Sequence, residues 1–136
     1  MNNETILREF MDRVWNKQEY ESVETFVDPE YRIHLDHGDP WEGKTLNNEE
    51  YKTRLKYSFD PFPDMHFDIQ SAVADGDCVG ITWIMTGTNL GSIAAFPSTG
   101  KSIKTFGLTI YYFRNGKVCG HSQVFDRTTV IKQLGF

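Results

Sequence analysis

Between Met65 and Asp126 the chain consists almost entirely of short segments in which apolar and polar residues alternate. Alternation places successive side chains on opposite faces of a strand, so each segment is predicted to be a half-buried strand. Two of the links, Asp75-Gly76-Asp77 and Asn115-Gly116, are short glycine turns that favour antiparallel hairpins. The predicted strands cover residues 65–73, 79–86, 103–113 and 118–125. The second half of the chain is therefore expected to form an antiparallel sheet.

The first half of the chain has mostly the spacing of helices. Apolar residues recur every three or four positions from Ile6 to Trp15, which predicts an amphipathic helix. The other expected elements are a short helix that ends before Pro29, a strand over residues 31–37, a helix over residues 49–59 and a last helix over residues 127–134. This order predicts an α+β fold in which helices cover one face of a curved antiparallel sheet. With 136 residues, the chain is expected to form one domain, 1–136.

Charge and composition exclude several classes of function. The formal net charge is −5 and no cluster of Lys and Arg stands out, so neither nucleic acid nor an anionic membrane is an expected partner. The N-terminal segment lacks the apolar core of a signal peptide, and no stretch has the ~20 apolar residues of a membrane span. We therefore expect a cytoplasmic protein. Aromatic residues make up 14% of the chain, which suits the lining of an apolar pocket.

Several short motifs occur together, in order, between Asp60 and Phe136. They are FPD at 62–64, GDCV at 76–79, TGTNLG at 86–91, PSTGKSI at 97–103, GLTIYYFRNGKV at 107–118, VFD at 124–126 and QLG at 133–135. By their joint order and spacing this part of the chain resembles the SnoaL-like polyketide cyclase family, in particular its ester-cyclase branch, within the nuclear-transport-factor-2-like superfamily. The first half agrees more loosely, through its amphipathic helix and the strand that carries His34.

The resemblance implies a cone-shaped fold that encloses an apolar pocket, in a homodimer. It also implies ring closure by intramolecular aldol condensation without metal or organic cofactor, with Asp126 as general acid and base. The chain departs from the family pattern where Gly120, His121 and Ser122 replace the common Glu, His, Trp, and where Asn89 replaces a frequent histidine. The substrate is therefore not carried over.

Asp126 has two alternative roles. It stands between a predicted strand and a predicted helix, where its carboxylate can cap the helix by accepting backbone N–H groups. In an apolar pocket, desolvation would instead raise its pKa and suit it to proton transfer. Alternation puts Asp126, Ser122 and Val124 on one strand face and His121 on the other. By resemblance we expect the Asp126 face to line the pocket, and His121 to lie on the outer face or at a dimer contact.

His34 is the second candidate catalytic residue, because a neutral imidazole can orient a carbonyl or share a proton with Asp126. The alternative for His34 is a structural histidine. His34, Asp36, His37 and Asp39 have metal-ligating side chains, but neighbouring positions point in different directions, so no metal site is expected. The residues expected to line the pocket are Trp15, Trp41, Trp83, Phe106, Tyr112 and Ser122. Bulky aromatic residues at such positions are also ordinary core residues.

Two functions remain for the chain. The first is a cofactor-independent enzyme, of cyclase, isomerase or lyase type, that performs acid/base chemistry on an apolar carbonyl substrate. The second is a non-catalytic protein that binds a small ligand in the same fold. We also expect a homodimer that forms through the sheet face carrying Thr82, Ile84, Thr86, Thr109 and Tyr111.

Overall fold

Helical segments occupy the start of the chain in the computed structural model, which describes residues 1–136. They are α1 (Asn3–Phe10), the π-helix η1 (Met11–Asn16), the 3₁₀ turn η2 (Tyr20–Ser22) and α2 (Val23–Phe26). The Asn2 side chain caps α1 by accepting a hydrogen bond from the Thr5 backbone N–H. The predicted amphipathic helix thus changes from α to π geometry within the stretch that carries its apolar residues.

The middle of the chain contains two strands and one helix. β1 spans Val27–Asp36, β2 spans Thr45–Leu46 and α3 spans Asn48–Phe59. α3 begins with a capping box. The Glu50 backbone N–H donates to the Asn47 side chain, and the Asn47 backbone N–H donates to the Glu50 side chain. This box fixes where α3 starts and therefore which of its residues face the sheet.

The second half of the chain forms the four predicted strands and a short helix. They are β3 (His66–Asp75), β4 (Cys78–Thr88), β5 (Ser102–Arg114), β6 (Lys117–Phe125) and α4 (Arg127–Gln133). The strand order in the sheet is β2-β1-β6-β5-β4-β3. Asn115 and Gly116 both adopt positive φ, at 51° and 77°, as a tight hairpin turn requires. The α+β prediction is confirmed, but the sheet is mixed because β1 pairs with β6 in parallel.

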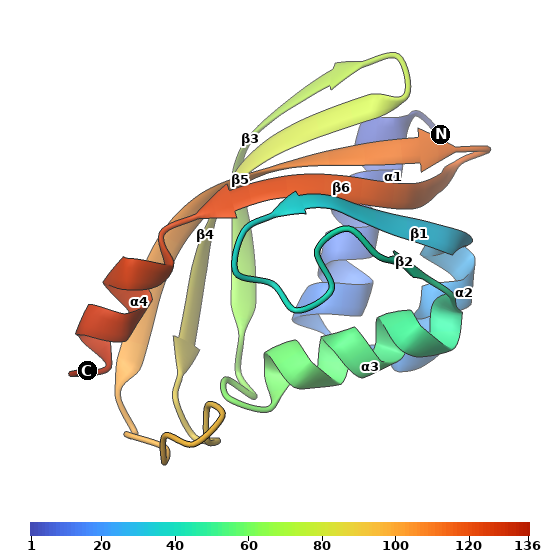
Figure 1. Cartoon of the computed structure of the whole chain (residues 1–136). Helices are drawn as coiled ribbons and strands as arrows, with labels where there is room; N and C mark the ends of the chain where they lie inside the picture. The colour runs from blue at the N-terminus through green and yellow to red at the C-terminus, as the bar shows by residue number, and fades with distance from the viewer.

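The helices α1 to α3 lie on the concave side of the curved sheet, and α4 lies at its open end with the C-terminus (Figure 1). The buried residues that join sheet and helices include Leu7, Phe10, Val14, Tyr31, Ile33, Leu55, Val79, Ile81 and Val118. None of the helices is long and apolar enough to cross a membrane.

An irregularity in β3 changes the side-chain pattern predicted for this strand. Ile69 pairs with Trp83 and Ser71 pairs with Thr82, so one residue, Gln70, has no opposite partner in β4. Such a bulge moves the following residues to the other face. Val73, predicted to share a face with Ile69, is therefore exposed on the outer side of the sheet.

Candidate functional site

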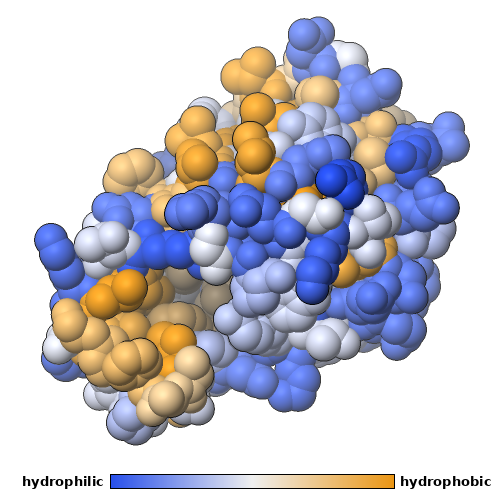
Figure 2. Space-filling view, viewed as in Figure 1, coloured by the Kyte–Doolittle hydropathy of each residue, from blue (hydrophilic) through white to orange (hydrophobic).

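A cavity of about 570 Å³, open to the surface on one side, lies between the concave face of the sheet and the helices η1, α3 and α4. Of its 30 lining residues, 19 are hydrophobic. Figure 2 shows the hollow at its lower left, with hydrophobic residues gathered around it. The lining includes Ile93 and Phe96 from the β4–β5 loop, Ile131 from α4, and Phe136. A volume of this size holds a small organic molecule.

Aromatic rings form one wall of the cavity. Phe67 packs edge-on against both Trp15 and Trp83, with centroid distances of 5.5 and 5.0 Å, and Trp83 lies 5.8 Å from Phe125. Gly107 on β5 leaves room for this arrangement, because a Cβ atom there would lie 2.4 Å from the Trp83 ring. The wall therefore offers apolar surface to a ring-containing ligand.

Asp36 lies at the end of β1, and only 1% of it is exposed. Its Oδ2 atom accepts hydrogen bonds from His121 Nε2 at 2.8 Å, Arg54 Nη2 at 3.2 Å and Gln123 Nε2 at 3.3 Å. Its Oδ1 atom accepts from Arg127 Nη2 at 3.1 Å. Burial raises the pKa of the Asp36 carboxyl, but the hydrogen bond from His121 and the charges of the two arginines outweigh it and lower the pKa. Asp36 is therefore ionised.

His121 on β6 connects Asp36 to the phenol of Tyr31. Its Nδ1 atom lies 2.5 Å from Tyr31 Oη, and both side chains are buried. Burial lowers the pKa of His121 and the hydrogen bond to Asp36 opposes this only in part, so the imidazole is neutral. An ionised carboxylate only accepts hydrogen bonds, so we assign the hydrogen to Nε2 and make the Tyr31 hydroxyl the donor to Nδ1. The result is a continuous chain of hydrogen bonds from Tyr31 through His121 to Asp36.

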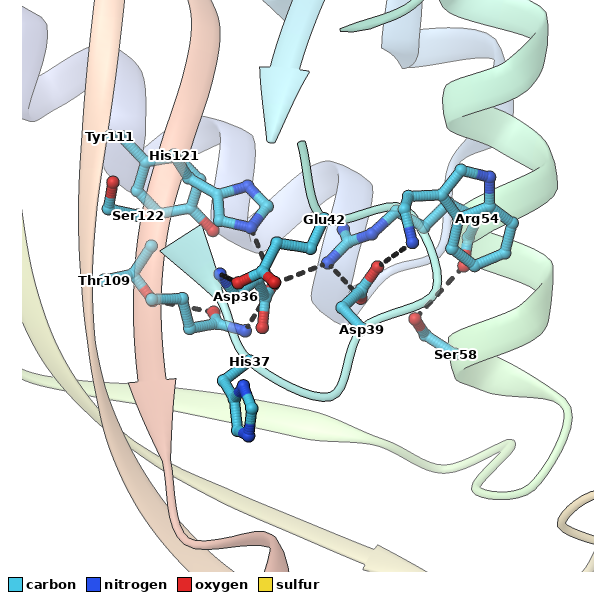
Figure 3. A network of polar contacts seen from close by, with 12 residues as sticks. Asp36, His37, Asp39, Glu42, Arg54, Ser58, Thr109, Tyr111, His121 and Ser122 are labelled. Carbon is cyan, nitrogen blue, oxygen red and sulfur yellow. Dashed lines mark hydrogen bonds and ion pairs between the residues drawn. The ribbon is translucent and has the colours of Figure 1, made fainter. Parts of the chain in front are cut away.

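Arg54 on α3 links this row of hydrogen-bonded residues to the loop after β1 (Figure 3). Its Nη2 atom donates to Asp39 Oδ2 at 2.9 Å as well as to Asp36. The Asp36 backbone N–H donates to Glu42 Oε2 at 2.7 Å, which ties the same loop to the end of β1. Gln123 accepts from Thr109, which in turn accepts from the Trp83 indole at 2.9 Å. The Asp36 carboxylate is thus held in place by residues of β1, α3, β5 and β6.

The predicted orientation of β6 is wrong. His121, expected on the outer face, is 2% exposed and lines the cavity, whereas Val124 is 65% exposed on the outer face. The parallel pairing of β1 with β6 places Asp36 opposite Gln123 and Ile33 opposite His121, so the interior side of β6 is the side with polar side chains.

Asp126 lies outside the cavity at the N-terminus of α4. Its Oδ1 accepts from the Thr129 backbone N–H at 3.0 Å, and its Oδ2 accepts from the Thr129 hydroxyl. The Thr129 hydroxyl, followed by the backbone N–H, holds the pKa of the Asp126 carboxyl below its usual value, opposite to the shift that an acid/base role would need. The arrangement favours the capping alternative.

A pair of substitutions at this position tests capping. Asp126→Ala should lower the melting temperature by roughly 3–6 °C, since the backbone N–H groups of the first turn lose their acceptor. Asp126→Asn should stay close to wild type because asparagine is an equally good cap. Thermal unfolding of the three proteins measures this, and equal losses in both variants would contradict it.

Three other predicted site residues come together, but on the outer face of the sheet. Tyr112 Oη lies 3.0 Å from Ser122 Oγ, and the His34 ring packs edge-on against Tyr112 at 5.0 Å. They line an open depression with Arg32 and Leu35. The sheet separates this depression from the cavity. The inner cavity, beside which Asp36, Arg54 and His121 are buried, is the candidate functional site.

Besides Tyr112, the other four predicted aromatic residues differ in their positions. Trp15 and Trp83 line the cavity. Phe106 is 66% exposed on the outer face, because it pairs with Ile84 on the side of β5 opposite the helices. Trp41 does not line the cavity, but its ring packs edge-on against Tyr57, which does, at a centroid distance of 5.1 Å.

No group of three or more His, Cys, Asp or Glu side chains is arranged to hold a metal ion. In the segment that carries His34, Asp36, His37 and Asp39, the two carboxylates bind Arg54 and the two histidines are exposed. Arg54 was not among the residues predicted from the sequence. Its signal is the spacing of Tyr51, Arg54, Leu55 and Phe59, which places an arginine on the buried face of α3.

Comparison with known proteins agrees with this fold. The family model for the SnoaL-like polyketide cyclase matches residues 5–134. A candidate polyketide cyclase from Acidithiobacillus ferrooxidans is 44% identical, with a TM-score of 0.92 over 97% of this chain and 93% of that one. IdmH, a candidate polyketide cyclase from Streptomyces antibioticus, is 24% identical, with a TM-score of 0.84 over 100% of both chains. A SnoaL-like polyketide cyclase from Agrobacterium tumefaciens is 21% identical, with a TM-score of 0.82 over 99% of both chains.

No curated protein matches the chain. The family match nevertheless covers nearly its whole length, and the relative that is 44% identical spans almost all of both molecules. With the fold that the structure shows, this chain belongs to the SnoaL-like polyketide cyclase family.

Proposed function

We propose that this protein is a cofactor-independent enzyme that moves protons on a small, mostly apolar carbonyl compound, as a cyclase or isomerase does. The observation that carries the proposal is the hydrogen-bonded chain of Tyr31, His121 and Asp36 beside a largely apolar cavity. The relatives described as polyketide cyclases support the same class of reaction.

The hydrogen-bonded residues Tyr31, His121 and Asp36 together supply both a base and an acid. Tyr31 Oη takes a proton from the carbon next to a substrate carbonyl while its own proton moves to His121 Nδ1. The electron pair of the broken C–H bond becomes an enolate. In a cyclase the enolate carbon then bonds to a second carbonyl carbon, and the new alkoxide takes the proton back through Tyr31. Asp36 stabilises the transient imidazolium, since its Oδ2 accepts from Nε2 at 2.8 Å.

Burial makes this chemistry effective. His121 is neutral at pH 7 because burial lowers its pKa, so it is ready to accept a proton. Asp36 remains charged within an apolar site, where its interaction with an imidazolium is stronger than in water. The arginines that hold Asp36 ionised also keep it from taking the proton itself.

The test is hydrogen–deuterium exchange at the α-carbon of aryl β-keto esters, followed by NMR in D₂O. We expect catalysed exchange at neutral pH. Because the pKa of His121 is lowered from about 6.5, the rate should stay on its plateau at pH 6.5 and fall only at lower pH. The free energy of unfolding should depend on pH in the same direction. The contribution of neutral His121 is present in full above pH ~6.5 and is lost as the pH falls through its folded-state pKa.

Two results would count against the enzyme. Loss of exchange beginning above pH 7 would assign the base to a different group. Tight binding of these esters with no exchange above the buffer rate would favour the alternative, a protein that binds a small ligand without converting it.

We further propose that the outer face of the sheet joins two copies of the chain. Leu108 and Val124 pair across β5 and β6, and with Phe106 and Ile110 they form a run of exposed apolar side chains. Figure 2 shows hydrophobic residues gathered on the side of the sheet turned away from the helices. Exposed apolar patches of this kind are typical of protein interfaces. Two residues expected on this face, Thr109 and Tyr111, are instead buried on the inner side of the sheet.

Sedimentation velocity at micromolar concentration should give a dimer for the wild type. Leu108→Glu should shift it to monomer without loss of the fold, because a carboxylate replaces an apolar contact at the centre of the patch. Lys104→Glu, on the same side of β5 but at its end, is the control and should remain dimeric. A wild-type monomer would remove the proposal.

A further inference from the structure

The open depression on the outer face of the sheet is built by neighbouring positions of three strands. Arg32 on β1 and Tyr112 on β5 both pair with Gly120 on β6, so the three residues form one row across the sheet. Gly120 places no side chain between the other two, and a Cβ atom there would lie 2.5 Å from the Arg32 backbone oxygen. The floor of the depression is therefore open between an arginine and a tyrosine.

Small residues at this point distinguish the chain from the family pattern. Gly120 and Ser122 stand where glutamate and tryptophan are common in that pattern. Side chains of that length would occupy the depression, and a glutamate on the strand beside Arg32 would offer it a carboxylate. In this chain the space stays open and Arg32 lacks that partner.

Arg32 is the arginine of this chain that forms no ion pair. The other five are each paired with a carboxylate, namely Arg8, Arg13, Arg54, Arg114 and Arg127. No acidic residue lines the depression, whose residues are Arg32, His34, Leu35, Tyr112 and Ser122. The formal net charge of −5 means that carboxylates are plentiful elsewhere on the chain. The depression therefore holds a positive charge that is free to bind an anion from outside.

The other polar groups around the depression can donate hydrogen bonds to such an anion. The imidazole of His34 carries at least one ring N–H, and its ring packs edge-on against Tyr112 at 5.0 Å. Tyr112 Oη and Ser122 Oγ lie 3.0 Å apart, so the bond between them uses one O–H and leaves the other free to donate. The complement of these groups is an anion with several acceptor oxygens.

The number of donors favours a phosphate group over a carboxylate. A guanidinium binds two oxygens of either group through parallel N–H bonds. A carboxylate then has no oxygen left, whereas a phosphate monoester has a third one for His34 or the hydroxyl pair. Leu35 is 68% exposed beside these groups and offers apolar contact to the organic part of the ester.

We propose that this depression is a binding site for a phosphate monoester, with Arg32 as its charged anchor and His34, Tyr112 and Ser122 as further donors. The sheet separates the site from the cavity, so binding needs neither the cavity nor the reaction proposed for it. The site adjoins the apolar patch of the outer face, because Ser122 pairs with Ile110. One chain supplies every donor, so a monomer should bind the ester as a dimer does.

The experiment is a titration of isotope-labelled protein with phenyl phosphate in phosphate-free buffer, followed by NMR. We expect the backbone amide signals of Gly120 and Ser122 to shift. Arg32→Gln should weaken binding about tenfold and Tyr112→Phe about threefold, because hydrogen bonds from a charged donor contribute more than those from a neutral one. Arg32 is exposed, so the fold should be kept. Lys104→Gln is the matched control, since it removes one positive charge on the same side of β5 but at its other end.

Two further ligands test the chemistry of the site. Inorganic phosphate lacks the organic group and benzoate lacks the third oxygen, so both should bind several-fold more weakly than phenyl phosphate. Leu108→Glu, the expected monomer, should bind phenyl phosphate as the wild type does. Leu108 is four positions from Tyr112 along β5, about 13 Å, which exceeds a Debye length at physiological salt.

Several results would overturn the site. They are no shift of the two amides at about 10 mM phenyl phosphate, shifts confined to cavity residues such as Trp83, equal weakening by Arg32→Gln and Lys104→Gln, or equal affinity for benzoate or inorganic phosphate. Loss of binding in Leu108→Glu would overturn a site formed by one chain. Tyr31→Phe separates this proposal from the catalytic one, since it should stop proton exchange and leave phenyl phosphate binding unchanged.

Discussion

Replacing His121 by asparagine is expected to lower the rate of α-proton exchange by about 10²–10⁴-fold, the usual contribution of a general acid/base. The asparagine side chain can still bond to Asp36, but it cannot take the proton that Tyr31 passes on. The same variant should bind carbonyl ligands with nearly unchanged affinity, because the cavity wall is otherwise intact. Exchange rates by NMR and affinities by calorimetry measure both effects.

The control for this substitution is His66→Asn. His66 is exposed on β3, and the exchange rate of the variant should match the wild type. A full exchange rate in His121→Asn, with the fold intact, would remove the imidazole from the reaction.

The second large effect concerns stability. Arg54→Met should reduce the free energy of unfolding by about 3–5 kcal/mol, the usual cost of removing one partner from a buried ion pair. The substitution leaves the Asp39 carboxylate without its cation and deprives Asp36 of one of two arginines. Denaturant unfolding with a two-state fit measures the loss.

An exposed ion pair gives the matched comparison. Arg8 pairs with Glu4 at 3.2 Å on the surface of α1, and Arg8→Met should cost less than about 1 kcal/mol. Similar small losses at both arginines would mean that the buried network contributes no more than a surface pair, and that the site is not held as described.

Strand positions could be predicted from the sequence because alternation and turn residues are local signals. The side of the sheet that faces inward could not be predicted from the same signals. On β5 the outward positions are apolar, as at Phe106 and Leu108, while the inward positions include Thr105 and Thr109. Thr109 belongs to the buried network through Gln123, and the apolar outward residues form the proposed dimer face, so hydrophobicity alone points to the wrong side.

The position of Asp36 depends on an irregularity that the sequence does not reveal. Tyr31 and Ile33 are buried, and strict alternation would bury Leu35 next and expose Asp36. The register of β1 against β6 shifts between Ile33 and Asp36, so Leu35 is exposed and Asp36 turns inward. Asp36 and His121 are 85 positions apart in the sequence, and only the tertiary structure brings the two side chains together.

In the proposed reaction the acid/base group is the hydrogen-bonded chain of Tyr31, His121 and Asp36 beside the cavity, and Asp126 is a helix cap. The most direct test is the α-proton exchange rate of Tyr31→Phe beside that of Asp126→Asn, on the same aryl β-keto ester and at the same pH. We expect Tyr31→Phe to lose exchange and Asp126→Asn to keep the wild-type rate. Loss of exchange in Asp126→Asn, with Tyr31→Phe still active, would contradict it.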